Sequence, residues 1–309
     1  MRTFFKQRPF ILFLAPGFII YTLFVIYPII AAARISLFQW NGIGDKIFVG
    51  LGNYVELFTN QELMSQMTNA LSHSLILFVL TVLIQLPIQI IMAYMIYTKA
   101  KGKNFFQVAV FSPQFISTPV IVFMFTLLFD GNIGLVNRFL EMVGLGQYAR
   151  PWLGTPSLGI YIVWVMIAWA GMGVGMMYML GAMKMVPYDS LESAYIEGAG
   201  FWRRLFFIVI PQVKMTIFNL ALLAYIFGMT IFDYSYILGG TEGGINGNMD
   251  VMSLFFYRMA FGDTNPLGGS ISKNSMGMGT TIACVLFLII FLAALAQILL
   301  VYRKEEDHE

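Results

Sequence analysis

The chain has 309 residues, of which 59% are hydrophobic and only 11% carry a charge. Soluble domains carry about 25% charged residues, so this chain has too few charged side chains to cover its surface in water. Disordered and collagen-like classes are excluded, and the single cysteine, Cys284, excludes a disulfide scaffold. The net charge of +2 does not indicate nucleic-acid binding. The composition indicates an all-α protein that crosses a membrane several times.

Six stretches have the length and polarity of membrane-spanning helices, because a helix needs about 20 mostly apolar residues to cross lipid. We expect them at about 10–33, 71–98, 104–129, 157–182, 213–238 and 277–302. The first is much longer than the apolar core of a secretion signal, so we interpret it as an uncleaved helix. The expected organisation is a membrane domain over 10–302 between the short tails 1–9 and 303–309.

Basic residues are concentrated on one side of the six expected crossings. Lys and Arg number 12 among the 52 residues of segments 1–9, 99–103, 184–214 and 303–309. The alternate segments 34–70, 130–150 and 233–273 contain 6 in 99 residues. Because cytoplasmic loops carry an excess of Lys and Arg, we expect both termini to lie in the cytoplasm.

The expected cytoplasmic loop over 184–214 has the pattern of a structured element. Asp189 and Glu192 have the spacing of a capping box, which predicts the start of a short helix. Gly198 permits the left-handed backbone that ends such a helix. Pro211 is suited to the start of a further helix.

Two roles are consistent with this loop when only its residues are considered. A short amphipathic helix can rest on the lipid surface, or it can dock into a groove of a soluble protein. Glu192 and Glu197 are repelled by an anionic membrane surface, which slightly favours a protein partner.

The loop resembles the cytoplasmic EAA loop of permease subunits in bacterial binding-protein-dependent ABC importers. That pattern is Glu-Ala-Ala, three residues, Gly, nine residues, Ile, two residues and Pro. Here it is matched by Glu192, Ser193, Ala194, Gly198, Ile208 and Pro211. The spacing is kept, and Ser193 replaces one alanine. Further stretches resemble the maltose-type first permease subunit, so that the similarity covers nearly the whole chain: 15–42, 48–58, 102–117, 134–146 and 236–261.

The resemblance implies a type I ABC importer transmembrane domain with six helices and a core at about 70–301. It implies a complex with a second permease subunit, two ATP-binding subunits and an extracytoplasmic solute-binding protein. Glu192 would make a polar contact with the ATPase, Ala194 would pack into its groove, Gly198 would allow the turn, and Pro211 would set the start of the next crossing. Such a subunit translocates a sugar or oligosaccharide across the bacterial cytoplasmic membrane by alternating access.

Motifs for catalysis or cofactor binding are absent from the sequence. There is no G-x-x-x-x-G-K-[ST], so we expect no ATP site and no cofactor in this chain, with ATP used by the partner subunits. Two histidines cannot form an H-E-x-x-H metal site, and no G-x-S-x-G nucleophile motif occurs. We therefore expect a transport subunit that is not itself an enzyme.

Polar residues inside the expected crossings are candidates for the solute path, because such residues tend to face the interior of a helix bundle. They are Gln85, Gln89, Asn219, Thr230, Asp233 and Tyr234. For Gln85 and Gln89 the alternative is a hydrogen bond between helices.

Two other functions are compatible with a polytopic chain. A secondary transporter driven by an ion gradient would need ionisable residues within the membrane, and pairs of Asp and Glu are absent from the apolar stretches. A membrane scaffold that transports nothing is the second alternative. The residues do not specify which sugar would be carried.

Overall fold

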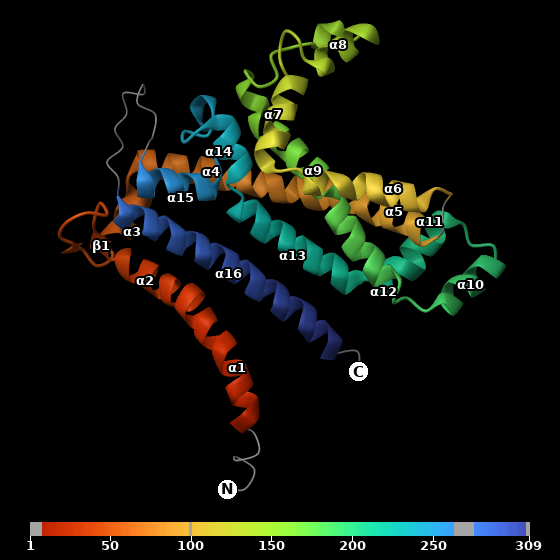
Figure 1. The fold of residues 1–309 in the computed structure, drawn as a ribbon, viewed down its shortest axis with the longest axis horizontal. Coiled ribbons are helices and arrows are strands. Elements are labelled where there is room, and N and C mark those ends of the chain that lie inside the picture. Colours follow the sequence, from red (N-terminus) through yellow and green to blue (C-terminus); the bar gives the residue numbers. More distant parts are fainter. Residues whose placement is uncertain (1–7, 99–100, 263–274, 307–309) are drawn as a thin grey trace. The chain divides into compact units, whose positions relative to one another are not determined.

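The computed structural model describes residues 8–98, 101–262 and 275–306, and in these ranges it is almost entirely helical (Figure 1). Within them, five helical spans are long and apolar enough to cross a membrane: Phe13–Ile35, Gln61–Tyr97, Pro156–Met183, Lys214–Gly239 and Met276–Leu299. A sixth consists of Lys103–Phe115 and Thr118–Leu128, which are bent by 103°. The expected all-α class is confirmed. The chain divides into two compact units, Met1–Met64 with Phe256–Leu288 and Ser65–Phe255 with Ile289–Glu309.

The first unit contains the N-terminal helices, a two-stranded hairpin and a short helix. Its elements are α1 (Arg8–Tyr21), a π-helical segment Thr22–Ile26, α2 (Tyr27–Ile35), β1 (Phe38–Gln39), β2 (Ile47–Phe48) and α3 (Gly52–Thr59), with parts of α15 (Met252–Phe261) and α16 (Met276–Glu306). β1 and β2 are antiparallel, with Phe38 opposite Phe48. The buried Asn53 donates from Nδ2 to the carbonyl oxygens of Ser36 (2.8 Å) and Phe38 (3.0 Å), which joins α3 to the end of α2 and to β1.

The second unit contains most of the helices. They are α4 (Gln61–Leu80), α5 (Leu86–Tyr97), α6 (Lys103–Phe111), α7 (Thr118–Leu128), α8 (Leu135–Met142), α9 (Gly159–Met183), α10 (Tyr188–Ile196), α11 (Phe201–Arg204), α12 (Ile210–Gln212), α13 (Lys214–Thr230) and α14 (Asp233–Gly239). The expected crossing 71–98 begins ten residues earlier in the structure, at Gln61, because α4 opens with polar turns that hydropathy does not mark. The expected crossing 213–238 is interrupted between Thr230 and Asp233.

Helix α9 is the centre of the second unit, because it contributes to both of the hydrophobic cores. One core includes Val163 and Met166 of α9. The other includes Met176 and Met179, with Tyr94 of α5. All five side chains are 0% exposed. A helix buried on two sides needs small residues wherever a neighbour crosses closely.

Glycines provide these close approaches along α9. A Cβ at Gly173 would lie 2.5 Å from Cα of Phe111 and 2.7 Å from the carbonyl oxygen of Val110, both in α6. A Cβ at Gly175 would collide with the side-chain amide of Gln89 in α5. The two glycines therefore set how closely α5 and α6 can pack against α9.

The expected continuous helix over 104–129 is wrong in one respect, since α6 and α7 meet at the sharp bend. Pro113 and Pro119 lack the N–H groups that would bond to carbonyls four residues earlier. The hydroxyl of Ser112 donates to the carbonyl oxygen of Ala109 (3.1 Å), which Pro113 leaves free. Ile116 and Ser117 are extended between the two prolines, so the chain turns there.

Three prolines within helical segments follow a π-helical turn, and a fourth, Pro16, lies inside α1. Pro28, Pro87 and Pro211 are each the second residue after a five-residue π-helical segment; these segments are Thr22–Ile26, Thr81–Gln85 and Leu205–Val209. In each case the residue after the segment donates its N–H to the carbonyl five positions back. The extra residue in the turn relieves the clash between the proline ring and the preceding turn. The helix continues past Pro28 and Pro87, whereas α12 ends at Gln212, one residue after Pro211.

We expect Gly173→Ala to destabilise the protein, because the added methyl group meets backbone atoms of α6 that cannot move aside independently. Overpacking of this kind costs about 1–3 kcal/mol. Gly181→Ala, in the same helix, is the matched control, because nothing lies within 4 Å of its Cβ position. Thermal unfolding in detergent should show a lower midpoint for Gly173→Ala and an unchanged or higher midpoint for Gly181→Ala. Equal midpoints would contradict the role of Gly173 in packing.

Candidate functional site

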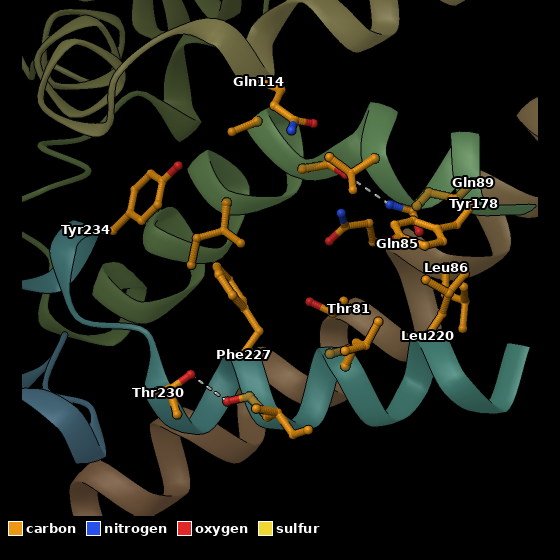
Figure 2. Close-up of a pocket in the computed structure, with 18 of the residues that line it drawn as sticks. Thr81, Gln85, Leu86, Gln89, Gln114, Tyr178, Leu220, Phe227, Thr230 and Tyr234 are labelled. Atoms are coloured by element: carbon orange, nitrogen blue, oxygen red, sulfur yellow. Dashed lines mark hydrogen bonds between the residues drawn. The ribbon is translucent and has the colours of Figure 1, made fainter. Parts of the chain in front are cut away.

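A cavity of about 580 Å³ lies within the second unit, between the π-helical segment Thr81–Gln85 with α5, the α6–α7 bend, α9 and α13 (Figure 2). Apolar side chains form most of its wall. The polar groups are amides and hydroxyls, contributed by Thr81, Gln85, Gln89, Gln114, Thr118, Tyr178, Thr230 and Tyr234. None of the described residues that line the cavity is charged.

The two glutamines of the cavity differ in how their amides are used. Gln89 donates from Nε2 to the carbonyl oxygens of Gly171 and Met172, both at 3.3 Å, so the alternative of a hydrogen bond between helices is confirmed for this residue. Gln85 is only 5% exposed, and its Oε1 is buried without a hydrogen-bond partner. Figure 2 shows its amide directed into the cavity. A buried acceptor without a partner is costly, and a ligand that donates a hydrogen bond would satisfy it.

The other four candidates of the solute path do not all meet at this cavity. Thr230 and Tyr234 line it, although the Thr230 hydroxyl donates within its own helix to the Ile226 carbonyl (2.8 Å). Asn219 lines a neighbouring cavity of about 560 Å³ instead. Asp233 is exposed and is absent from both linings. Asp233 begins α14, after the break that interrupts the fifth crossing. Its side chain therefore does not continue the face of α13 on which Thr230 meets the cavity.

Four polar lining residues were not among the candidates from the sequence, namely Thr81, Gln114, Thr118 and Tyr178. Thr81 is four residues before Gln85 and eight before Gln89, so helical spacing was a usable signal for it. Its hydroxyl accepts a hydrogen bond from Nε1 of Trp164 (3.3 Å). Gln114 reaches the cavity because of the bend between α6 and α7. In the sequence, only Pro113 and Pro119 indicated that bend. Tyr178 lines both cavities, together with Leu220 and Leu223.

The second candidate site is α10 and the turn that follows it. The expected capping box is wrong: Pro187 occupies the N-cap position, no side chain bonds there, and Asp189 lies within the first turn. The proline side chain has no acceptor atom, so the first N–H groups of α10 receive no side-chain cap. The hydroxyl of Ser193 donates back to the Asp189 carbonyl at 2.9 Å.

The left-handed turn expected at Gly198 is confirmed, with φ at +79°. Gly198 donates its N–H to the Tyr195 carbonyl (3.0 Å), and Ala199 donates to the Ala194 carbonyl (2.9 Å). This pair of bonds is a Schellman motif, which ends a helix and satisfies its last carbonyls. The turn thus gives α10 a sharp end before α11 begins.

The two faces of α10 differ strongly in exposure. Leu191 and Ala194 are buried against this chain, at 7% and 9% exposure, whereas Tyr195 and Ile196 are 66% and 79% exposed. Glu192 and Ser193 are also exposed. The expectation that Ala194 packs into a partner's groove is therefore corrected, since its side chain faces its own protein. The exposed surface is formed by Glu192, Ser193, Tyr195 and Ile196. In Figure 1, α10 lies at an end of the second unit.

The two remaining residues of the family pattern lie on the segment that leads into α13. Ile208 packs against the core that contains Tyr94 and Met179. Pro211 is exposed and belongs to α12, two residues after the end of a π-helical segment. Both therefore shape the path between α10 and the next crossing. Among the residues that the structure describes, no group of three His, Cys, Asp or Glu side chains is placed to hold a metal ion.

A family profile and two relatives of similar sequence all indicate the same kind of protein. Residues 85–305 match the profile of the family described as "Binding-protein-dependent transport system inner membrane component". The probable ABC transporter permease protein YurN of Bacillus subtilis is 32% identical over 290 residues, which cover 93% of each chain. The arabinooligosaccharides transport system permease protein AraP of the same species is 27% identical, over 95% of this chain and 88% of its own.

A solved structure supports the same fold. A chain of a bacterial alginate ABC transporter, in complex with an alginate pentasaccharide-bound periplasmic protein, superposes with a TM-score of 0.76 at 21% identity. The superposition covers 96% of this chain and 94% of that chain. The fold is that of a type I ABC transporter membrane domain, and the chain belongs to the family of binding-protein-dependent inner-membrane components, as a permease subunit of an ABC importer.

Proposed function

We propose that the cavity around Gln85 is the part of the solute path held by this subunit, and that the solute is a neutral sugar or oligosaccharide. The proposal rests on Oε1 of Gln85, a buried acceptor without a hydrogen-bond partner. The described lining of its cavity contains no charged residue. Hydroxyl groups of a sugar can donate to Gln85, and the apolar wall suits the C–H faces of a sugar ring. The relative named for arabinooligosaccharides supports this class of solute.

The proposed assembly comprises this chain, a second permease subunit, two ATP-binding subunits and an extracytoplasmic solute-binding protein. The partner subunits use the ATP. The membrane is the bacterial cytoplasmic membrane, and both termini lie in the cytoplasm, as the excess of Lys and Arg on that side supports. A cavity with no Asp, Glu, Lys, Arg or His in its described lining gives no support to the alternative of an ion-driven transporter.

In this proposal, α10 couples the ATPase to the membrane helices. The exposed Ser193 and Ile196 form the contact, in the mode of a helix lying in a groove. The buried Leu191 and Ala194 fix α10 to its own chain, so that a movement of α10 is passed to the core that holds α5 and α9. The sharp turn at Gly198 and the segment with Ile208 and Pro211 connect α10 to α13, one wall of the cavity.

Gln85→Met is expected to slow transport without loss of the fold. The change removes an acceptor that bonds to nothing within the protein, and it keeps the length of the side chain. Since one hydrogen bond contributes about 0.5–1.5 kcal/mol, the maximal rate of sugar uptake in proteoliposomes should fall about two- to tenfold. Leu83→Met, at an exposed position of the same segment, is the matched control. Full uptake by Gln85→Met would remove Gln85 from the path.

Gly198→Val is expected to uncouple ATP hydrolysis from transport. Valine in the left-handed conformation costs about 1–2 kcal/mol, so the Schellman turn would reorganise and α10 would shift. Gly200→Val is the control, because Gly200 has a φ of −68° and nothing near its Cβ position. Solute-stimulated ATP hydrolysis and uptake are measured in the reconstituted importer. Coupled transport at the normal rate in Gly198→Val would refute the role of this turn.

A further inference from the structure

A further cavity lies where α5, α10 and α11 meet. It is a cavity of about 370 Å³, lined by Tyr94 and Tyr97 of α5, Tyr195 and Glu192 of α10, and Arg204 of α11. It shares no residue with the cavity around Gln85. Aromatic rings and two opposite charges thus enclose one small volume.

Two polar groups of this cavity are buried without partners. Tyr94 is 0% exposed, and its hydroxyl makes no hydrogen bond. The Nε of Arg204 is likewise buried without a bond, while its guanidinium lies over the ring of Tyr195 at 5.1 Å. Buried polar groups are nearly always satisfied in folded proteins, so two unsatisfied donors at one cavity point to an absent occupant. Both can donate to an anionic oxygen.

The other lining residues indicate which group of the occupant would lie opposite Arg204. Glu192 carries the opposite charge, so a simple anion would be repelled on that side. Tyrosine rings attract cations over their faces, and Glu192 adds a carboxylate acceptor. The combination suits a zwitterion, with a phosphate oxygen at Arg204 and Tyr94 and an ammonium group at Glu192 and the tyrosine rings.

The position of the cavity indicates where such a zwitterion comes from. Tyr94 and Tyr97 end the Gln61–Tyr97 span, at the level where lipid headgroups meet a spanning helix. Trp202 and Phe206, on either side of Arg204, are 55% and 54% exposed and stack at 6.0 Å between ring centroids. Exposed aromatic residues of this kind are typical of the membrane–water interface.

We infer that this cavity binds the phosphate and primary ammonium of an amine-bearing phospholipid headgroup, the chemistry of phosphatidylethanolamine. The occupant would touch α5, α10 and α11 together, and so would stabilise one position of α10. This consequence for coupling rests on the proposed function of α10, whereas the binding itself does not.

Native mass spectrometry of the importer, isolated with its partner subunits, tests the inference. The probes are nanodiscs of phosphatidylethanolamine, phosphatidylcholine or phosphatidylglycerol. We expect phosphatidylethanolamine to be retained, and Arg204→Gln and Tyr94→Phe to reduce its retention about tenfold, the size expected for losing one charge-assisted bond. Tyr94→Phe keeps the packing of the ring, and Arg203→Gln, an exposed neighbour outside the lining, is the control.

Equal retention of all three lipids, or equal retention in all variants, would overturn the inference. Protection of the importer against heat by soluble phosphoethanolamine, but not by phosphatidylethanolamine, would assign the site to a soluble ligand and overturn the lipid as its source. Retention of the lipid by the permease subunits alone, and its loss when the ATP-binding subunits are added, would show that a protein side chain fills the cavity. This result would also overturn the inference. Because lipid retention and ATPase association are measured separately, failure here is distinguishable from failure of the proposed coupling.

Discussion

The close packing of α9 against α5 and α6 is the constraint on which the second unit depends. Glycines 173 and 175 allow the approach, and the amide of Gln89 then bonds to the backbone carbonyls of Gly171 and Met172. Such bonds replace the hydrophobic driving force that lipid does not supply between helices. Both hydrophobic cores lie along α9, so the cavity and the support of α10 share this one helix.

Prolines give the structure its second constraint. Where the chain inserts a π-helical residue before a proline, as before Pro87, the helix continues and its side chains rotate relative to the preceding turn. Thr81 and Gln85 lie in that segment, which directs Gln85 into the cavity. Where no such residue is inserted, at Pro113 and Pro119, the chain bends and brings Gln114 to the same cavity. The π-helical residue before Pro87 and the bend at Pro113 and Pro119 therefore place Gln85 and Gln114 at the same cavity.

The two cavities differ in the polar groups that line them. The larger cavity has no charged lining among the described residues and one unused acceptor, which suits transient contact with a hydroxylated solute. The smaller cavity next to α10 contains Arg204 and Glu192, which suits a longer-lived occupant at the membrane surface.

Composition and hydropathy were sufficient to predict an all-α membrane protein, and Gly198 predicted the turn that ends α10, because hydropathy and φ > 0 are local requirements. The family was indicated by a resemblance, carried by the spacing from Glu192 to Pro211. The tertiary structure alone decided that Ala194 faces inward, that Asn219 and Asp233 leave the main cavity, and that Gln89 is bonded while Gln85 is free. Those outcomes depend on which helix packs beside each residue. Periodicity identifies the polar positions of a helix, whereas the partner that each position meets follows only from the packed bundle.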